Sequence, residues 1–219
     1  MRKVLSFTAF ATVAVMATAT GTSHAAGLSF EQLSTGQLNQ VFDPSPGVGL
    51  PALAPKNGDT ISLGQLTALL PGTITFTYLG QESGFKNGLD LRVGTAGNVL
   101  TETTVGDRTS ASIGAGIVDF RFFDSNGKGA ANGPMSGWDT FTSIGLLATG
   151  FTVSTAVGSL KAGDQFDFVL AFNDSGKGHD DWDDYVVGVN MAPIPEPGTY
   201  ALMLAGLAAV GFVARRRKA

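Results

Sequence analysis

The sequence of 219 residues contains no cysteine, only two histidines and little charge, because Asp, Glu, Lys and Arg make up 15% of it. Without cysteine, the chain has no disulfides, thiol nucleophiles or thiolate metal sites. The low charge is unlike that of a chain kept disordered by its own charges. The net charge of −4 argues against a nucleic-acid-binding protein. The 30 glycines are about twice the usual share and favour a turn-rich, all-β domain.

Residues 1–25 have the pattern of an export signal. Arg2 and Lys3 precede a long apolar run, and Ser23 and Ala25 are small residues at the two positions that matter before a cut. We therefore predict a signal helix over these residues that directs export and is then removed. A retained N-terminal anchor is the alternative interpretation.

The C-terminal end combines three features in a fixed order. These are a Pro-Glu-Pro triplet, a short apolar run and a basic cluster, found at Pro195, Glu196 and Pro197, at 200–214, and at Arg215, Arg216 and Arg217. As a helix the apolar run would reach about 23 Å, less than the roughly 30 Å of a hydrocarbon core. The basic cluster would stay on the cytoplasmic side of the membrane. The pattern predicts a short transmembrane sorting helix within 195–219 that is processed rather than kept as an anchor.

These three features resemble the PEP-CTERM sorting signal of Gram-negative bacteria. The likeness covers residues 194–219, with Ile194 at the position where the family usually has Val. The resemblance implies recognition by an exosortase, which is a membrane protease-transpeptidase, and processing near the Pro-Glu-Pro triplet. It also implies a destination at the cell surface or in the extracellular matrix, often beside exopolysaccharide. An uncut tail anchored in the inner membrane is the alternative on hydropathy alone.

Residues 26–194 remain between the two signals and have the size of one domain with its own core. This segment holds 8 basic and 17 acidic residues, which gives it a net charge of −9. Such a surface should repel phosphate backbones and attract divalent cations.

Alternation of apolar and polar residues predicts several short antiparallel strands in this domain. The predicted strands are 73–78, 89–93, 118–122, 151–153, 166–172 and 185–189, with turns at 86–88 and 125–127. Residues 64–70 fit either a short helix or a strand, and the proline-rich residues 40–58 are expected to be extended. Several short strands with one solvent-exposed face indicate an all-β fold, namely an antiparallel β-sandwich of jelly-roll type.

The usual catalytic templates are missing from the sequence. It has no G-x-S-x-G elbow, no Walker loop and no H-E-x-x-H motif, and His179 is the only histidine outside the predicted export signal. We therefore expect no enzyme activity and no catalytic residues. A polysaccharide-modifying hydrolase stays as an alternative, because two carboxylates can suffice for glycoside hydrolysis.

One acidic segment between two predicted strands is the candidate metal site. Its carboxylates are Asp174, Asp180, Asp181, Asp183 and Asp184. Like charges this close repel one another unless they are solvated, protonated or neutralised by a cation, and hard oxygen ligands suit Ca²⁺. The spacing does not match an EF-hand loop. Two ligand sets stay open, either Asp174, Asp181 and Asp183, or Asp180 and Asp184 on the other face. A solvated acidic turn is the competing interpretation.

A second, looser resemblance involves the same segment. Residues 172–187 run from Phe-x-Asp through a glycine-containing loop to two Asp pairs around an aromatic residue and then Val-Val. This pattern resembles the closing segment of a family of uncharacterised bacterial surface β-sandwich domains. Residues 76–87 look like an early strand and loop of similar exported proteins. The resemblance implies a sandwich fold and is compatible with calcium.

The sequence thus predicts an exported, non-catalytic protein of the cell surface or extracellular matrix, stabilised by Ca²⁺ and associated with exopolysaccharide or biofilm. Its expected partners are an exosortase, the export machinery and, transiently, the inner membrane. A carbohydrate-binding module is the alternative, provided that Trp138 or Trp182 is exposed; a packed indole is the opposing expectation. Residues 124–128 are expected to be a hairpin turn rather than an ion site.

Overall fold

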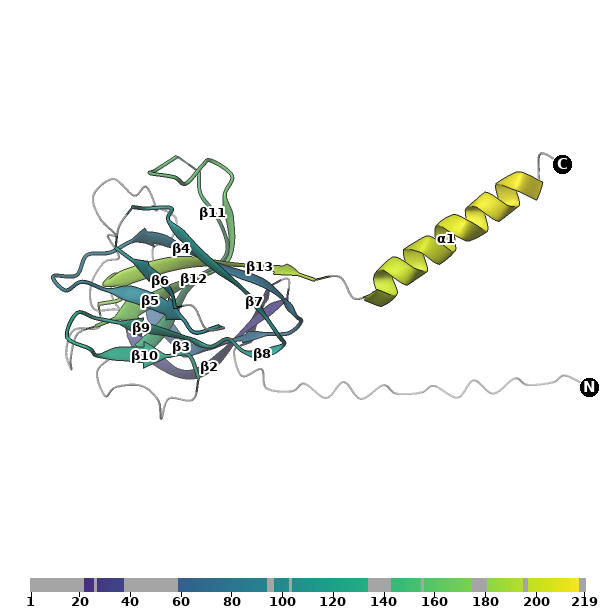
Figure 1. Cartoon of the computed structure of the whole chain (residues 1–219). Coiled ribbons are helices and arrows are strands. Elements are labelled where there is room, and N and C mark those ends of the chain that lie inside the picture. The colour runs from purple at the N-terminus through teal and green to yellow at the C-terminus, as the bar shows by residue number, and fades with distance from the viewer. Residues whose placement is uncertain are drawn as a thin grey trace, which may run out of the picture.

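Most of the described chain consists of β-strands, which form two antiparallel sheets packed face to face (Figure 1). The computed structural model describes residues 22–25, 27–37, 59–93, 97–102, 104–133, 143–154, 156–174, 181–194 and 197–216. The predicted all-β sandwich is confirmed. The two sheets are open and unequal in size.

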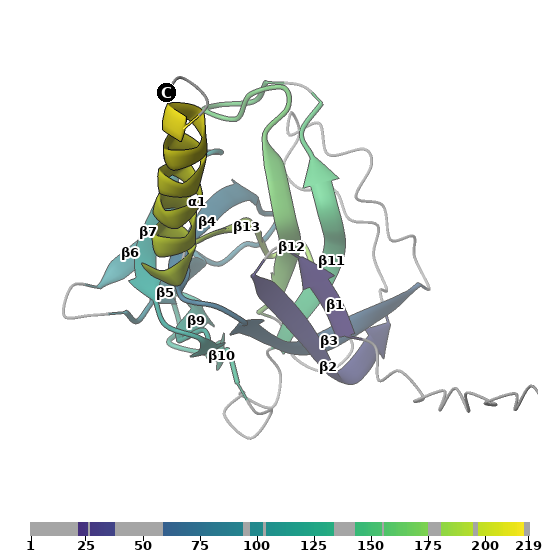
Figure 2. The same cartoon turned by 90° about the vertical axis from the view of Figure 1, so that its right-hand side faces the viewer.

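The larger sheet has nine strands in the order β1-β2-β3-β11-β12-β13-β4-β7, with β8 paired to β3. Its strands are β1 (Thr22–Ala25), β2 (Leu28–Gln37), β3 (Thr60–Ala68), β4 (Gly72–Gly80), β7 (Arg108–Ile113), β8 (Gly116–Ile117), β11 (Ser143–Thr152), β12 (Gln165–Asn173) and β13 (Tyr185–Pro193). The smaller sheet has four strands in the order β10-β9-β5-β6. These are β5 (Gly88–Leu91), β6 (Asn98–Thr101), β9 (Phe120–Phe123) and β10 (Gly129–Ala131). Figure 2 shows the smaller sheet on one side and β1, β2, β3, β11 and β12 on the other.

The main core lies between the two sheets and is rich in aromatic side chains. Phe122 of the smaller sheet stacks on Phe172 of β12, with ring centroids 5.3 Å apart, and meets the ring of Tyr185 at 6.0 Å. Phe76 of β4 packs against Phe120 at 5.0 Å. All five side chains are fully buried. Because each large ring removes much apolar area from water, this aromatic seam accounts for a large share of the contact between the sheets.

The outer face of the larger sheet is also covered in part. Trp182 is 2% exposed and packs with Ile61, Leu63 and Ala171. A Cβ on Gly145 would lie 2.8 Å from the indole, so the absence of a side chain there lets the ring lie directly on the sheet. The expectation of a packed tryptophan is therefore confirmed for Trp182, and a buried indole cannot stack on a sugar. Trp138 lies outside the described residues.

The alternating segments behave as predicted, with differences at their ends. Residues 73–78 and 166–172 lie within β4 and β12, and 64–68 is the strand alternative rather than a helix. Of the predicted strand 89–93 only 89–91 is strand, and of 118–122 only 120–122. Strand β11 extends eight residues before the predicted start at Phe151. Strands β2, β6, β7, β8 and β10 were not predicted. In β7 (Arg108–Ile113), which lies at an edge of the sheet, polar residues occupy the exposed positions. The expected extended segment 40–58 lies outside the described residues.

The last four residues of the predicted signal segment 1–25 do not form a helix. Thr22–Ala25 are strand β1, which pairs antiparallel with β2, with Ala25 opposite Leu28. Pairing gives the edge of β2 a hydrogen-bonded neighbour, which explains a strand at this position. A cut after Ala25 would remove β1 and leave β2 as the edge of the sheet. Residues 1–21 lie outside the described part of the chain.

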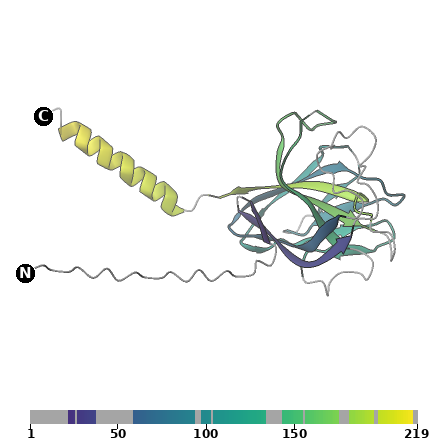
Figure 3. The same cartoon turned by 180° about the vertical axis from the view of Figure 1, so that it is seen from behind.

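Strand β13 is a central strand, with β12 on one side and β4 on the other. It runs from Tyr185 to Pro193 and ends at the edge of the sandwich that faces helix α1 (Pro197–Arg216) (Figure 3). The predicted C-terminal helix therefore forms, and every described side chain of α1 is exposed. Within the part of the chain that the structure describes, no helix meets the length and apolarity expected of a membrane span.

Candidate functional site

The candidate residues gather at one end of the sandwich, where β4 and β12 end and β5 and β13 begin. We call this the acidic end and define it by Ser83, Asn87, Glu102, Asp174, Asp181, Asp183 and Asp184. Three of these carboxylates are buried, with Asp174 3%, Asp183 1% and Asp184 5% exposed. A solvated acidic turn is therefore wrong for these three residues. Asp181 is half-buried, and Asp180 lies outside the described residues.

Asp174 is held by neutral donors from the β4–β5 loop. The Asn87 Nδ2 atom donates to Asp174 Oδ2 at 2.6 Å, and the Ser83 hydroxyl donates to the same oxygen at 2.6 Å. Asn87 Nδ2 also donates to the carbonyl oxygen of Asp184 at 2.9 Å. Asn87 is itself 2% exposed. One amide thus ties the start of β5 to both ends of the β12–β13 connection, across 87 and 97 residues of chain.

The buried carboxyl group of Asp184 is stabilised in a different way from that of Asp174. Its Oδ2 accepts a hydrogen bond from the backbone N–H of Asp174 at 2.7 Å. Burial nevertheless raises the pKa of Asp184 to about 8, and the charges of Asp174 and Asp181 push it in the same direction. The raised pKa favours the protonated carboxyl group of Asp184 over the ionised one. Protonation removes one of the negative charges that would repel each other at this end.

Two further groups complete the acidic end. The backbone N–H of Asn87 donates to Glu102 Oε1. Burial raises the pKa of Glu102, with an added contribution from Asp174, while the Asn87 hydrogen bond opposes the rise. The hydroxyl of fully buried Tyr185 donates to the carbonyl of Leu100 at 2.8 Å, which links β13 to β6 of the other sheet. The acidic end is therefore a hydrogen-bonded joint between the two sheets.

A cavity of about 260 Å³ opens beside this joint. It is lined by Glu82, Ser83, Gly84, Phe85, Asp174, Asp181 and Asp184. Among the described residues, no group of three or more acidic or histidine side chains is arranged to hold a metal ion. The Oδ1 atom of Asn87 is buried without a hydrogen-bond partner among the described residues, and calcium binding stays a prediction.

Sequence reasoning missed Asn87 and Ser83 as parts of the site. Both lie in residues 76–87, the segment that resembles an early loop of exported sandwich proteins, and their partners lie in 172–187. The two segments that carry this resemblance therefore meet in space. A small polar residue before a strand is also typical of an ordinary turn, so only the tertiary contact distinguishes the two roles.

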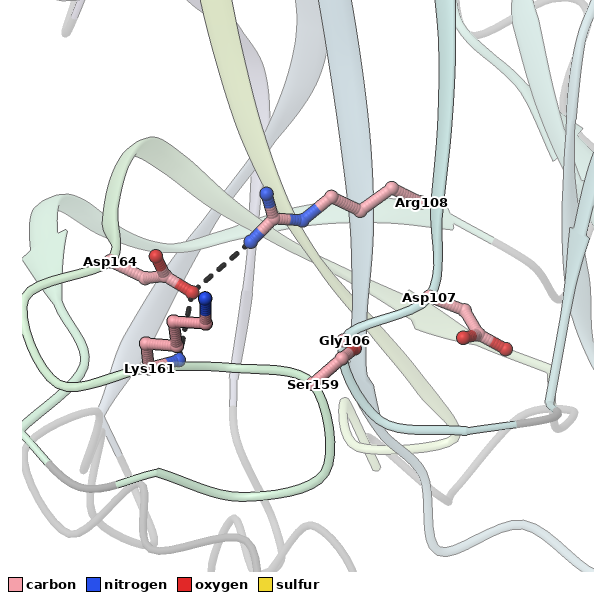
Figure 4. A pocket seen from close by; sticks show the side chains of 6 residues that line it. All are labelled: Gly106, Asp107, Arg108, Ser159, Lys161 and Asp164. Atoms are coloured by element: carbon pink, nitrogen blue, oxygen red, sulfur yellow. Dashed lines mark hydrogen bonds and ion pairs between the residues drawn. The ribbon is translucent and has the colours of Figure 1, made fainter.

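A second cavity of about 410 Å³ lies between the start of β7 and the loop before β12 (Figure 4). Arg108 Nη2 pairs with Asp164 Oδ2 at 3.1 Å, and the same oxygen accepts the backbone N–H of Lys161 at 2.9 Å. Ser159 Oγ donates to the carbonyl of Val105 at 3.3 Å. In Figure 4 Asp107 points away from the pair. These contacts brace two loops and do not form a nucleophile next to a base.

The β9–β10 connection is the hairpin turn that was predicted for residues 124–128. Asp124 Oδ1 accepts from the backbone N–H groups of Asn126 at 2.9 Å and Lys128 at 2.8 Å. The carboxylate is satisfied within its own turn, and Gly127 takes a positive φ of 82° that suits glycine.

The tail leaves from the opposite end of β13. The backbone N–H of Ile194 donates to the carbonyl of Pro71 at 2.9 Å, one residue beyond the strand. Three residues later α1 begins at Pro197. Residues 193–218 match the family model of the PEP-CTERM protein-sorting motif. The chain carries a PEP-CTERM sorting motif.

The PEP-CTERM motif starts where the sandwich ends, and it is consistent with an exosortase substrate that is exported. Pro197, Arg215 and Arg216 lie in α1, whereas Pro195, Glu196 and Arg217 lie outside the described residues. The two arginines occupy the last turn of α1, where cations are favoured by the helix dipole, and Arg216 lies 4.9 Å from the ring centre of Phe212. No curated protein and no solved structure shows significant similarity to the chain.

Proposed function

We propose that this chain is a non-catalytic surface or matrix protein, delivered when an exosortase processes its PEP-CTERM tail in the inner membrane. The observation that carries the proposal is the position of the motif, which follows directly on central strand β13. The described part of α1 is exposed along its length, and the buried core is built from the two sheets. Processing at the Pro-Glu-Pro triplet would therefore release or transfer an intact sandwich.

The polar groups of the sandwich support a structural role rather than a catalytic one. Asp174 is engaged by Asn87 and Ser83, and Asp164 is engaged by Arg108. A glycosidase needs two carboxyl groups that face a sugar in a cleft, one of them ionised. At the acidic end, the carboxyl group of Asp184 accepts the backbone N–H of Asp174 itself. These contacts hold loops together and favour the non-catalytic proposal over a hydrolase.

Mass spectrometry of the mature C-terminus tests this function. In a host with an exosortase we expect a new end close to the Pro-Glu-Pro triplet, and in the same host without the enzyme we expect the chain to continue to Ala219. Glu196→Ala should block processing. Glu82→Ala, which also removes an acidic side chain but lies in the folded domain, should not. A C-terminus at Ala219 in the presence of a working exosortase would refute the proposal.

Calcium at the acidic end is a second part of the proposal. The charges of Asp174 and Asp181 act on Asp184, and that of Asp174 acts on Glu102, so a cation would relieve repulsion at this end. The buried Oδ1 atom of Asn87 is a neutral oxygen of the type that Ca²⁺ accepts. Removing calcium with EDTA should lower the Tm of the exported protein, and adding Ca²⁺ should restore it by more than Mg²⁺ does. If neither EDTA nor Ca²⁺ changes the Tm, calcium does not stabilise the acidic end and this part of the proposal is wrong.

Association with exopolysaccharide or biofilm follows from the proposed destination. The buried position of Trp182 gives no support to a carbohydrate-binding module built on this residue. We expect the processed domain to fractionate with the extracellular matrix through its processed tail. Recovery of the tail-less domain in the same fraction would instead indicate direct glycan binding.

A further inference from the structure

The end of the sandwich from which the tail leaves has an unusual surface. Three segments meet there, namely 69–72, 113–118 and 191–194. Gly72 of β4 lies between Ile113 of β7 and Pro193 of β13 in the sheet register. On the other flank, Gly116 of β8 lies opposite Ala68 at the end of β3. Figure 1 shows β7, β8 and the end of β13 together on the side of α1.

These three segments contain no charged residue and no side chain that forms hydrogen bonds. Four of their large apolar side chains are nevertheless about half exposed, with Leu69 at 48%, Leu70 at 45%, Ile117 at 51% and Ile194 at 54%. We call this surface the apolar tip and define it by these four residues. Scattered exposed apolar residues are ordinary, but several large apolar side chains on segments that meet at one end of a domain mark a candidate contact surface.

The tail determines what this surface meets. Ile194 and Pro197, the first residue of α1, are three Cα steps apart, so at about 3.8 Å per step they are separated by at most about 11 Å. The described apolar side chains of α1 are exposed, for example Leu202 at 76% and Val210 at 68%. The interfacial layer on each side of a hydrocarbon core is roughly 5–8 Å thick. When α1 is in the membrane, the tip therefore lies within or next to this layer.

We propose that the apolar tip rests on the lipid bilayer while the tail is in the membrane, so that the sandwich stands on this end with its acidic end directed outward. The inference depends on the proposed function, because it requires the tail to reside in a membrane. The tip has no basic side chain, so the contact is apolar and does not need anionic lipid. Ile117 shares the lining of a cavity of about 310 Å³ with Arg92 and Asp119, so one flank of the tip is bordered by charged side chains.

This orientation has a consequence for processing. The Pro-Glu-Pro triplet begins directly after Ile194, so the tip and the site of processing lie at the same depth. A sandwich that stands on its tip presents the triplet at the membrane surface, where a membrane-embedded protease can reach it. The acidic end, at the other end of β13, then faces away from the lipid surface.

Site-specific fluorescence on the full chain in vesicles tests the proposal. The chain has no cysteine, so each introduced cysteine is a unique attachment point for an environment-sensitive dye. Leu70→Cys and Ile117→Cys place the dye on the tip. Phe85→Cys at the acidic end and Val99→Cys on β6 are matched controls, because they are exposed to a similar degree, 43% and 52%. The vesicles are phosphatidylcholine that contains a lipid-attached quencher.

We expect several-fold stronger quenching at Leu70 and Ile117 than at Phe85 and Val99, and the same result when anionic lipid is included. Ile117→Asp should reduce the quenching of a dye at position 70, whereas Val99→Asp should not. Equal quenching at the two ends, or none at the tip, would overturn the proposal.

Two other outcomes separate the causes of failure. A tip dye that is already in an apolar environment without vesicles, and unchanged by them, would show that α1 or a second copy of the chain covers the tip instead of lipid. A chain that does not float with vesicles at all would overturn both this inference and the membrane step of the proposed function. A chain that floats without tip quenching would overturn this inference alone.

Discussion

The two ends of strand β13 differ in which side chains they bury and which they expose. At its start, Asp184 and Asp174 bury carboxyl groups among neutral donors, and at its end Ile194 leaves an apolar side chain in contact with solvent. Folding normally hides apolar groups and leaves charges in water. At the acidic end, hydrogen bonds within the chain explain why carboxyl groups are buried instead of solvated. At the apolar tip, the described residues cover only about half of each large side chain, and we propose that lipid covers the rest.

The largest effect is expected at the acidic end, from Asn87→Ala. The change removes the donors to Asp174 Oδ2 and to the Asp184 carbonyl and leaves both acceptors buried. Loss of partners for buried polar and charged groups should lower the free energy of unfolding by about 3 kcal/mol. Asn126→Ala, in the exposed β9–β10 turn, is the control and should change it by less than about 0.5 kcal/mol. Similar urea midpoints for the two variants would contradict the role of Asn87.

Tyr185→Phe should have the next largest effect. It keeps the ring that stacks on Tyr78 but removes the hydroxyl that donates to the Leu100 carbonyl, which is buried between the sheets. We expect a loss of about 1.5 kcal/mol, measured by urea unfolding, with little change in the slope of the transition. An unchanged midpoint would mean that Leu100 finds another donor and that this link between the sheets is dispensable.

Asp184→Asn should change how stability depends on pH. The folded pKa of Asp184 is about 8 against an ordinary value of 3.8, so the native state binds the proton more tightly than the unfolded state. Its contribution is fully present below about pH 4 and is lost as the pH rises through 8. An asparagine keeps the acceptor for the Asp174 N–H and does not ionise. The variant should therefore equal the wild type near pH 4 and have a Tm about 2–4 °C higher at pH 9.

The pH experiment also separates a proton from a calcium ion at this end. If Ca²⁺ occupies the site, Asp184→Asn should lower the Tm when calcium is present. A Tm difference that is the same at pH 4 and pH 9 would show that folding does not raise the pKa of Asp184.

The smallest effect on stability is expected at the apolar tip. Leu70→Ser and Ile117→Ser alter side chains that are already about half exposed, so each should cost less than about 1 kcal/mol in thermal unfolding without lipid. Their effect should appear only with vesicles. A loss as large as that of Asn87→Ala would mean that the tip is covered within the folded chain, and the contrast between the two ends would fail.

Local sequence patterns were sufficient to predict the strands in which apolar and polar residues alternate between a buried and a more exposed face. Ile74 and Phe76 alternate with threonines, and both are buried in β4 as predicted. The Pro-Glu-Pro triplet, the apolar run and the arginines identify the tail without any structure, because a receptor reads them as a contiguous segment. Strands such as β7 escaped prediction because their edge position allows polar residues on the exposed face.

The acidic end illustrates what local patterns cannot supply. The closely spaced aspartates predicted either a metal site with one of two ligand sets or a solvated turn. The structure instead buries Asp174, Asp183 and Asp184 and joins Asp174 to residues some 90 positions away. The sequence has no means of showing that Asn87 is the donor, since an asparagine before Gly88 is an ordinary turn residue. The apolar tip was equally invisible, because its three segments are short and lie far apart in the chain.

By itself, the sequence determined that this chain is a β-rich, cysteine-free domain that carries a sorting tail, because hydrophobic alternation and a contiguous signal are encoded between near neighbours. Only the tertiary structure decided which acids are buried, which of them has a raised pKa, and which apolar segments form the surface next to the tail. Those properties depend on contacts between distant residues and on the exclusion of water, and neither exists until the two sheets have packed.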